Sequence, residues 1–350
     1  MSEIIKNRSE ILFLYDVKDN NPNGDPLDGN KPRIDEETNI NIVTDVRLKR
    51  TIRDYLMNFK NEEIFVKEII YDEEGHIQDA KLRAKDFIKA NENDENKQKI
   101  ISKFLNKEKI DKTDVETIRK NIQHNLLIDA IDTRMFGATV PLEFNSKEIE
   151  KLDKDKKIKT SVTLTGPVQF RMGRSLHKVE LKYIKGTGAF ASKAGATQKT
   201  FREEYILPYS LIAFYGIINE NAAKHTNLTD KDVQLLLEGI WNGTKNLISR
   251  SKAGQGPRLL LKINYNKNNY HIGDLDKLIK IDTDKRDEEI RDVGEITLNT
   301  EELANILIDL KNTIESIEIK IDGRLATNLE EKLSKHFELK KINWLPNNGK

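Results

Sequence analysis

The hydrophobic pattern of residues 1–60 predicts a strand, a loop and a helix. Residues 10–17 (EILFLYDV) form a short, mostly apolar run, and the turn-forming sequence Asn-Asn-Pro-Asn-Gly ends it. A loop rich in Pro, Gly, Asn and Asp follows, after which Thr44 is a suitable N-cap for a helix. The apolar residues of this helix recur on one face, which we expect to be buried: Leu48, Ile52, Tyr55, Leu56 and Phe59.

The middle of the chain differs in amino-acid composition. Residues 60–160 are rich in Lys, Asn and Glu and predict a helical insertion with charged edges. Apolar runs and alternation then predict strands over 160–170, 205–218 and 257–265. A helix capped by Thr229 lies between the last two strands.

The strong elements therefore follow the order β-α-β-β-α-β. This order is the ferredoxin-like arrangement that RNA-recognition modules also use. We expect an α+β fold with a ferredoxin-like (RRM-like) centre and insertions between its elements. Residues 271–350 form a C-terminal acidic and mixed α/β extension. Within it, 276–302 carries ten Asp/Glu against five Lys/Arg, which suits either a solvated surface or a basic face of another copy.

The composition narrows the class of protein. With 350 residues and 37% hydrophobic content, the chain can form a sizeable core in one or two domains. It has no cysteine, which excludes disulfides, thiolate zinc sites and a cysteine nucleophile. No apolar run has the length of a membrane span and no signal peptide is recognisable, so we expect a soluble, cytoplasmic protein that does not bind membranes.

Basic residues cluster locally, although the formal net charge is only +1. Residues 47–53 and 244–262 contain four and five Lys/Arg, respectively, and no acid. Residues 173–202 contain seven Lys/Arg and one acid, Glu180. Each window alone is also compatible with a solvated surface. Two of the windows contain Gly-rich turns, however, and cations beside exposed backbone N–H groups suit a phosphate backbone.

These windows supply candidate nucleic-acid contacts. Phe190 in the glycine-rich loop is a candidate for base stacking or wedging, and packing against a neighbour is the alternative. The candidates that these windows supply for contact with RNA are His177, Lys178, Phe190, Lys193, Arg250, Lys252 and Arg258.

Candidate catalytic and metal sites are weak. The six histidines show no paired metal-binding spacing, and the GTGAFASK stretch lacks the spacing of a phosphate-binding loop. His177 is a candidate general base, but an ordinary contact is the simpler interpretation. The aspartates of loop 16–35 could hold a divalent cation, yet Asn-Gly, Asp-Pro and Asp-Gly pairs are routine turn chemistry. We expect no catalytic residue, no metal and no cofactor.

Four motifs in fixed order resemble a known family. They are the stretch from Asp16 that contains NPNGDP and TDVRLKR, then IDTRMFGA (131–138), TGPVQFRMGRS (165–175) and ILPYSLIAFYGIIN (206–219). Together they resemble the Cas7 backbone family of CRISPR Cascade complexes, and within it the type I-B subfamily. The resemblance extends from about residue 10 to residue 265.

The resemblance implies a molecule shaped like a right hand. Its RRM-like palm would comprise residues 1–59, 161–172 and 205–270. The helical insertion 60–160 would be the fingers, and residues 173–204 would be a protruding thumb, as a hairpin or loop. No family motif falls within the extension 271–350, so the resemblance assigns it no role.

The resemblance also implies a function. In the family, several copies assemble along the spacer of the CRISPR RNA, and the thumb of each copy displaces a nucleotide while the other bases pair with target DNA. The expected partners are CRISPR RNA, target DNA through the guide, other copies of the chain and other Cascade subunits. The alternative that remains open is a metal- or His-dependent CRISPR-associated endoribonuclease of the same fold.

Residues carried over from the family motifs fall at two places. The TDVRLKR match points to Lys49 and Arg50 as contacts to guide phosphates. The FRMGRS match points to the base of the thumb, with Met172 as a wedge against a displaced base: Arg171, Met172, Arg174 and Ser175.

Overall fold

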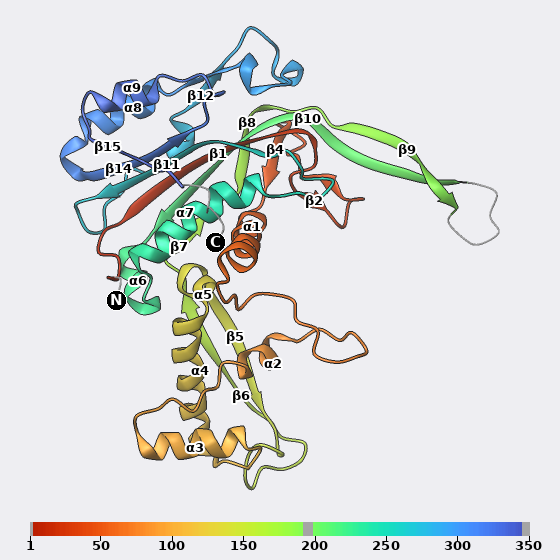
Figure 1. Ribbon diagram of the computed structural model, residues 1–350, viewed down its shortest axis with the longest axis vertical. Helices are drawn as coiled ribbons and strands as arrows, with labels where there is room; N and C mark the ends of the chain where they lie inside the picture. The colour runs from red at the N-terminus through yellow and green to blue at the C-terminus, as the bar shows by residue number, and fades with distance from the viewer. Residues whose placement is uncertain (1–2, 192–198, 345–350) are drawn as a thin grey trace, which may run out of the picture. The chain divides into compact units, whose positions relative to one another are not determined.

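The structure is a computed structural model that describes residues 3–191 and 199–344, with side chains outside 187–202 (Figure 1). The chain divides into two compact units. The sheet unit comprises Lys6–Tyr55, Gln169–Asn219 and the chain from Leu235 onwards. The insertion unit comprises the residues up to Ile5, Leu56–Val168 and Glu220–Gln234. Within the described ranges, no helix is both long and apolar enough to cross a membrane.

A mixed sheet forms the centre of the sheet unit, in the order β15-β14-β11-β1-β10-β8-β4. Strand β1 (Ser9–Asn20) is antiparallel to both of its neighbours, β10 (Lys199–Ile218) and β11 (Gly256–Tyr265). Strands β14 (Ile314–Ile321) and β15 (Leu339–Lys341) pair in parallel and come from the C-terminal extension. The expected α+β class is therefore confirmed, with β8 (Gly173–Lys178) and β4 (Ile40–Val43) at the other edge.

Helices α1 (Asp45–Lys60) and α7 (Asp230–Lys245) pack together in the sheet unit (Figure 1). Their contact depends on small residues, because a Cβ at Gly239 of α7 would lie 3.0 Å from the Ile52 side chain. On the sheet, Lys320 of β14 lies 5.3 Å from the ring of Trp241 in α7. Helix α7 therefore covers the sheet face that carries Lys320.

The local prediction for α1 is largely confirmed. Thr44 caps the helix, since its Oγ1 accepts a hydrogen bond of 3.2 Å from the backbone N–H of Arg47. The apolar face is buried from Leu48 to Leu56. Phe59, however, is 53% exposed, so the buried stripe ends one turn earlier than its spacing predicts.

The C-terminal extension covers the opposite face of the sheet. Its elements are β12 (Lys280–Asp282), β13 (Thr297–Asn299), α8 (Glu301–Asp309) and α9 (Leu329–Ser334). Leu12 and Leu14 of β1 share one hydrophobic core with Leu303, Leu307 and Leu329 of the extension. The sheet is therefore buried on both faces, unlike an RRM sheet, which binds RNA on an open face.

The insertion unit is only partly helical. It contains α2 (Ala80–Lys85), α3 (Glu95–Leu105), α4 (Val115–Asp129), α5 (Ile131–Phe136) and α6 (Glu220–Thr226). The prediction of a helical segment up to residue 160 misses strand β5 (Gly137–Phe144), whereas the strand predicted over 160–170 is present as β6 (Ile158–Thr165) and β7 (Val168–Phe170). The predicted palm strand 161–172 lies mostly outside the central sheet, because β6 pairs with β5 in an antiparallel hairpin of the insertion unit. The hairpin forms because Val140, Leu142 and Phe144 alternate along β5 and pack into the core with α4.

Candidate nucleic-acid interface

The loop between β1 and α1 uses its aspartates within the loop itself. Asp25 lies in the short strand β2 (Gly24–Asp25), which pairs with β3 (Lys31–Pro32). Its side chain pairs with Arg33 at 2.6 Å and accepts a hydrogen bond from Leu27 N. Asp35 accepts hydrogen bonds from the backbone N–H groups of residues 37 and 38, which lower the pKa of this carboxyl. Across the described residues, no group of three His, Cys, Asp or Glu side chains could hold a metal ion.

The two α1 cations predicted from the TDVRLKR motif both have acidic partners on their own helix. Lys49 Nζ lies 2.9 Å from Asp45, and its side chain is only 14% exposed. Arg50 Nε lies 2.7 Å from Asp54, and its side chain is 58% exposed. A phosphate that contacts either cation must therefore compete with a carboxylate one helical turn away.

The FRMGR segment presents three of the predicted residues at the surface. It links β7 (Val168–Phe170) to β8 and passes so close to the ring of Phe214 that a Cβ at Gly173 would lie 2.5 Å from it. Met172 is 55% exposed, and the Arg174 side chain is also 55% exposed, 3.7 Å from Asp35. Phe214 thus supports the backbone from inside while Met172 and Arg174 face outwards.

Arg171 is held by two partners in the sheet unit. Its guanidinium carbon lies 4.7 Å from the ring centre of Tyr215 and pairs with Asp274 of the C-terminal extension. The hydrogen bond to Asp274 raises the pKa of Arg171. Its side chain nevertheless stays 54% exposed, so one side of the guanidinium is open to a ligand.

Ser175 and His177, by contrast, lie in the interior. The Ser175 hydroxyl donates to His177 O at 2.7 Å and accepts from Asn41 N at 2.9 Å. His177 Nε2 accepts from Leu211 N at 3.2 Å, so its proton is on Nδ1, which donates to Lys178 O at 2.8 Å. Burial lowers the pKa of His177 and favours its neutral form. Both side chains connect β8 to its neighbours, and neither position suits the predicted contact with RNA or a general base.

The predicted thumb contains a long hairpin. Strand β9 (Lys182–Ala191) pairs with the first part of β10, from Lys182 opposite Ile206 to Lys199 opposite Ala191. Lys178, just before the hairpin, is exposed. The predictions for the Phe190 side chain and for Lys193 fall outside the described residues.

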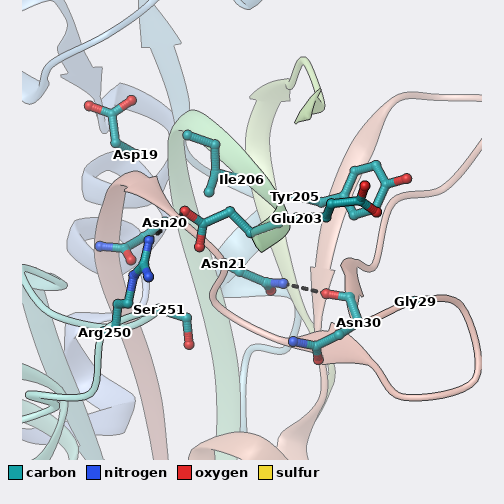
Figure 2. A pocket seen from close by; sticks show the side chains of 11 residues that line it. Asp19, Asn20, Asn21, Gly29, Asn30, Glu203, Tyr205, Ile206, Arg250 and Ser251 are labelled. Atoms are coloured by element: carbon teal, nitrogen blue, oxygen red, sulfur yellow. Dashed lines mark hydrogen bonds and ion pairs between the residues drawn. The ribbon is translucent and has the colours of Figure 1, made fainter. Parts of the chain in front are cut away.

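Cations of the third basic window occupy different environments. Arg250 pairs with Glu204 at 2.9 Å beside a pocket of about 210 Å³ that Asn20, Asn21 and Ser251 also line (Figure 2). Arg258 is buried between Asp16 at 2.9 Å and Asp322 at 2.5 Å. The predicted RNA contact at Arg258 is therefore an internal ion-pair residue, because no side of its guanidinium reaches the surface.

The window around α1 also contains a cation that the motif match did not select. Arg47 is half-buried, and its Nη2 donates to Thr51 Oγ1 at 3.3 Å. Lys252, also half-buried, donates from Nζ to Asn21 O at 3.0 Å. Burial and the nearby Arg47 lower the pKa of Lys252 to about 8. Periodicity could have placed Arg47 beside the buried stripe, but nothing in the sequence indicates its proximity to Lys252.

The chain is similar to known proteins in sequence and in fold. The family model described as CRISPR-associated protein Cas7 matches residues 7–301. The chain is 32% identical over 329 residues to the CRISPR-associated protein Cas7 of Haloferax volcanii, covering 92% of this chain and 89% of that protein. Its fold resembles a chain of a CRISPR RNA-guided surveillance complex in a pre-nicking state, with a TM-score of 0.50, 10% identity, and coverage of 94% and 100%. This chain belongs to the Cas7 family of CRISPR-associated proteins.

Proposed function

We propose that this chain is the guide-binding backbone subunit of a type I Cascade complex, of the I-B subtype. Several copies assemble along the spacer of the CRISPR RNA and hold its phosphates, which leaves most bases free to pair with target DNA. Other Cascade subunits complete the assembly. Membership of the Cas7 family over most of the chain is the observation that carries this proposal.

The hand-like architecture is part of the proposal. The elements β1, α1, β8, β10, α7 and β11 form a ferredoxin-like palm, and the sheet order β11-β1-β10-β8 supports this assignment. The insertion unit serves as the fingers, and the β9–β10 hairpin serves as the thumb. Because the C-terminal extension covers one sheet face and α1 and α7 cover the other, the guide must follow the edges and loops of the palm.

The proposed RNA contacts lie on the segment that links β7 to β8 and at α1. Arg171 and Arg174 meet phosphates, and the exposed Met172 between them wedges against a displaced base. Lys49, Arg50, Lys178, Arg250 and Lys252 add cationic contacts, and Phe190 and Lys193 act at the hairpin end. Ser175, His177 and Arg258 support these positions from inside.

The subunit acts without catalysis in this proposal. A general base needs an imidazole that reaches the substrate, whereas both ring nitrogens of His177 are hydrogen-bonded within the chain. The loop aspartates 25, 28 and 35 are engaged in turns and ion pairs. These engagements favour a binding subunit over the endoribonuclease alternative.

Size-exclusion chromatography with light scattering tests the proposal. The purified chain is mixed with a single-stranded RNA of spacer length, with and without Mg²⁺, and RNA integrity is checked on a gel. We expect discrete high-mass complexes that contain intact RNA. A chain that stays monomeric beside the RNA, or RNA recovered as fragments, would contradict the proposal.

A further inference from the structure

Two lysine-rich segments, 97–112 and 147–159, lie at the same end of the insertion unit, where Figure 1 shows α3 and the connection between β5 and β6. A bridge between Ile110 and Ile149 joins them, and Ile110 N donates a hydrogen bond to Glu148 O at 3.0 Å. Both isoleucines are only 1% exposed and belong to the core of the insertion unit. The bridge therefore holds the two segments together, and we call their combined surface the lysine patch.

The lysine patch has an excess of positive charge that the protein itself does not neutralise. Its two segments contain twelve lysines, six Asp/Glu and no arginine. Three of the lysines, Lys97, Lys156 and Lys157, form ion pairs. The other nine are exposed, and none of them pairs with a carboxylate of the described chain. They include Lys103, Lys109 and Lys112 on the first segment and Lys147, Lys154 and Lys159 on the second.

The composition of the lysine patch distinguishes between classes of partner. Protein interfaces are depleted in lysine and enriched in arginine and aromatic residues, so a protein partner does not fit. A single-stranded nucleic acid is held largely by aromatic side chains that stack on its bases. In the patch, however, Phe104 packs against Phe144 with 5.8 Å between the ring centres, and the one large apolar side chain exposed among its described residues is Leu105. Lysines without exposed aromatic neighbours suit a duplex, whose bases lie inside and whose phosphates lie outside.

We infer that the lysine patch binds the phosphate backbone of double-stranded DNA without reading its sequence. Lysine ammonium groups on flexible stems act as point charges, which suits phosphates at varying positions. The inference goes beyond the proposed function, because the free chain should bind duplex DNA without any guide. In a complex with guide RNA, the same contact keeps duplex DNA near the guide before its strands separate.

Titrations of duplex DNA against two triple variants test the site. Fluorescence anisotropy of the full chain, without guide RNA, is measured with two short duplexes of unrelated sequence at about 50 and about 200 mM salt. The wild type should bind both duplexes alike. Each triple variant should reduce the salt slope by about 0.9 to about 2.7, because each phosphate contact of B-DNA contributes about 0.9. The first variant combines Lys103→Gln, Lys109→Gln and Lys112→Gln, and the second combines Lys147→Gln, Lys154→Gln and Lys159→Gln.

Matched controls separate the lysine patch from the general charge of the chain. The triple Lys231→Gln, Lys267→Gln and Lys311→Gln removes three exposed lysines outside the patch that also pair with no carboxylate of the described chain. This control should keep the wild-type salt slope. Replacing the same patch lysines by arginine should preserve duplex binding, since the charge is kept. Binding of spacer-length single-stranded RNA, measured in parallel, should be equal in the wild type and in all variants.

Three other outcomes would overturn the inference. A wild type that does not bind duplex DNA, or equal slope losses in the patch and control triples, would mean that the patch is not a DNA site. If the patch variants lose affinity for single-stranded RNA as well, the patch takes the guide instead. If their duplex affinity is unchanged but their complexes on guide RNA become smaller, the patch contacts another protein. Failure of the proposed function is distinct, because the wild type then binds duplex DNA but no single-stranded RNA, and the inference about the patch stands.

Discussion

Glu10 is a carboxylate in the interior of the sheet unit, on β1, with no exposed surface. All four of its partners can donate: Tyr215 OH and Gly273 N to Oε1, and Tyr265 OH and Ile272 N to Oε2. The hydroxyls come from β10 and β11, whereas the backbone donors begin the C-terminal extension. Burial and the hydrogen bond to Glu10 raise the pKa of Tyr215, so its phenol stays protonated as a donor. Glu10 thus fixes the extension to the sheet.

Replacing Glu10 should therefore destabilise the fold strongly. Glu10→Ala leaves two backbone N–H groups and two hydroxyls without their acceptor, which costs at least about 3 kcal/mol of the free energy of unfolding. Urea unfolding followed by circular dichroism measures the loss. Glu302→Ala, which removes an exposed glutamate of the same extension, is the matched control. If both variants unfold at the same urea concentration, Glu10 does not have this role.

Of the four residues of β8 that the sequence singled out, two are exposed and two are buried. Arg174 and Lys178, selected as RNA contacts from the motif and the basic window, both lie on the exposed side of β8. Ser175 and His177 were selected with them, although strand alternation places these positions on the buried side. The motif match selected consecutive residues without regard to the strand period. Applying the period of two to 173–178 would have separated the exposed positions from the buried ones.

The β9–β10 hairpin is an element whose removal should leave the sheet unit intact. Strand β10 pairs with β1 from Leu207 to Ile218, and its earlier residues pair with β9. Because these two ladders occupy different parts of one strand, shortening the hairpin leaves the β1 ladder unbroken.

Deleting residues 186–195 should therefore preserve folding and impair assembly. We expect a thermal midpoint within about 4 °C of the wild type, which corresponds to a change of less than about 2 kcal/mol in the free energy of unfolding. Light scattering should show smaller and less uniform complexes on spacer-length RNA. A variant with a shortened β5–β6 connection, between residues 145 and 157, is the control for loop shortening. Full-length complexes formed by the 186–195 deletion would refute the thumb assignment.

At the level of elements, the sequence of β1 already indicated that both faces of the sheet are covered. Residues 11–14 of β1 are apolar without alternation, a pattern typical of a strand buried on both faces. The prediction used this run only to place a strand, so the role of the extension stayed open. Its packing depends on residues that are far apart in sequence but share one core, such as Leu12 and Leu303, and no local pattern can predict this. The missed strand β5 has a different cause, because the Lys-, Asn- and Glu-rich composition of 60–160 was interpreted as helical although Val140, Leu142 and Phe144 alternate.

At the scale of the whole molecule, many of the described acidic and basic side chains form ion pairs with one another. The exposed candidate cations Arg50, Arg171 and Arg250 each contact a carboxylate, and the net charge of the chain is only +1. In the proposed function, RNA phosphates replace these carboxylates. Because each exchange replaces one ionic partner by another, a single copy binds RNA with modest affinity. Tight binding then requires many copies on one guide.

Asp274 provides a test of this exchange, because it belongs to the extension and pairs with Arg171, which lies beside Tyr215 of β10. Asp274→Asn removes the competing charge, so affinity for single-stranded RNA should rise by about two- to fivefold at low salt. The gain should disappear at about 500 mM salt, where exposed charges are screened. Anisotropy titrations at both salt concentrations measure the effect, with Glu302→Gln as the control for one lost negative charge. Since the hydrogen bond from Arg171 lowers the pKa of Asp274, the carboxylate is charged throughout the neutral range, and the comparison holds at any pH from about 6 to about 8. An equal gain in both variants would mean that net charge, rather than the partner of Arg171, governs RNA binding.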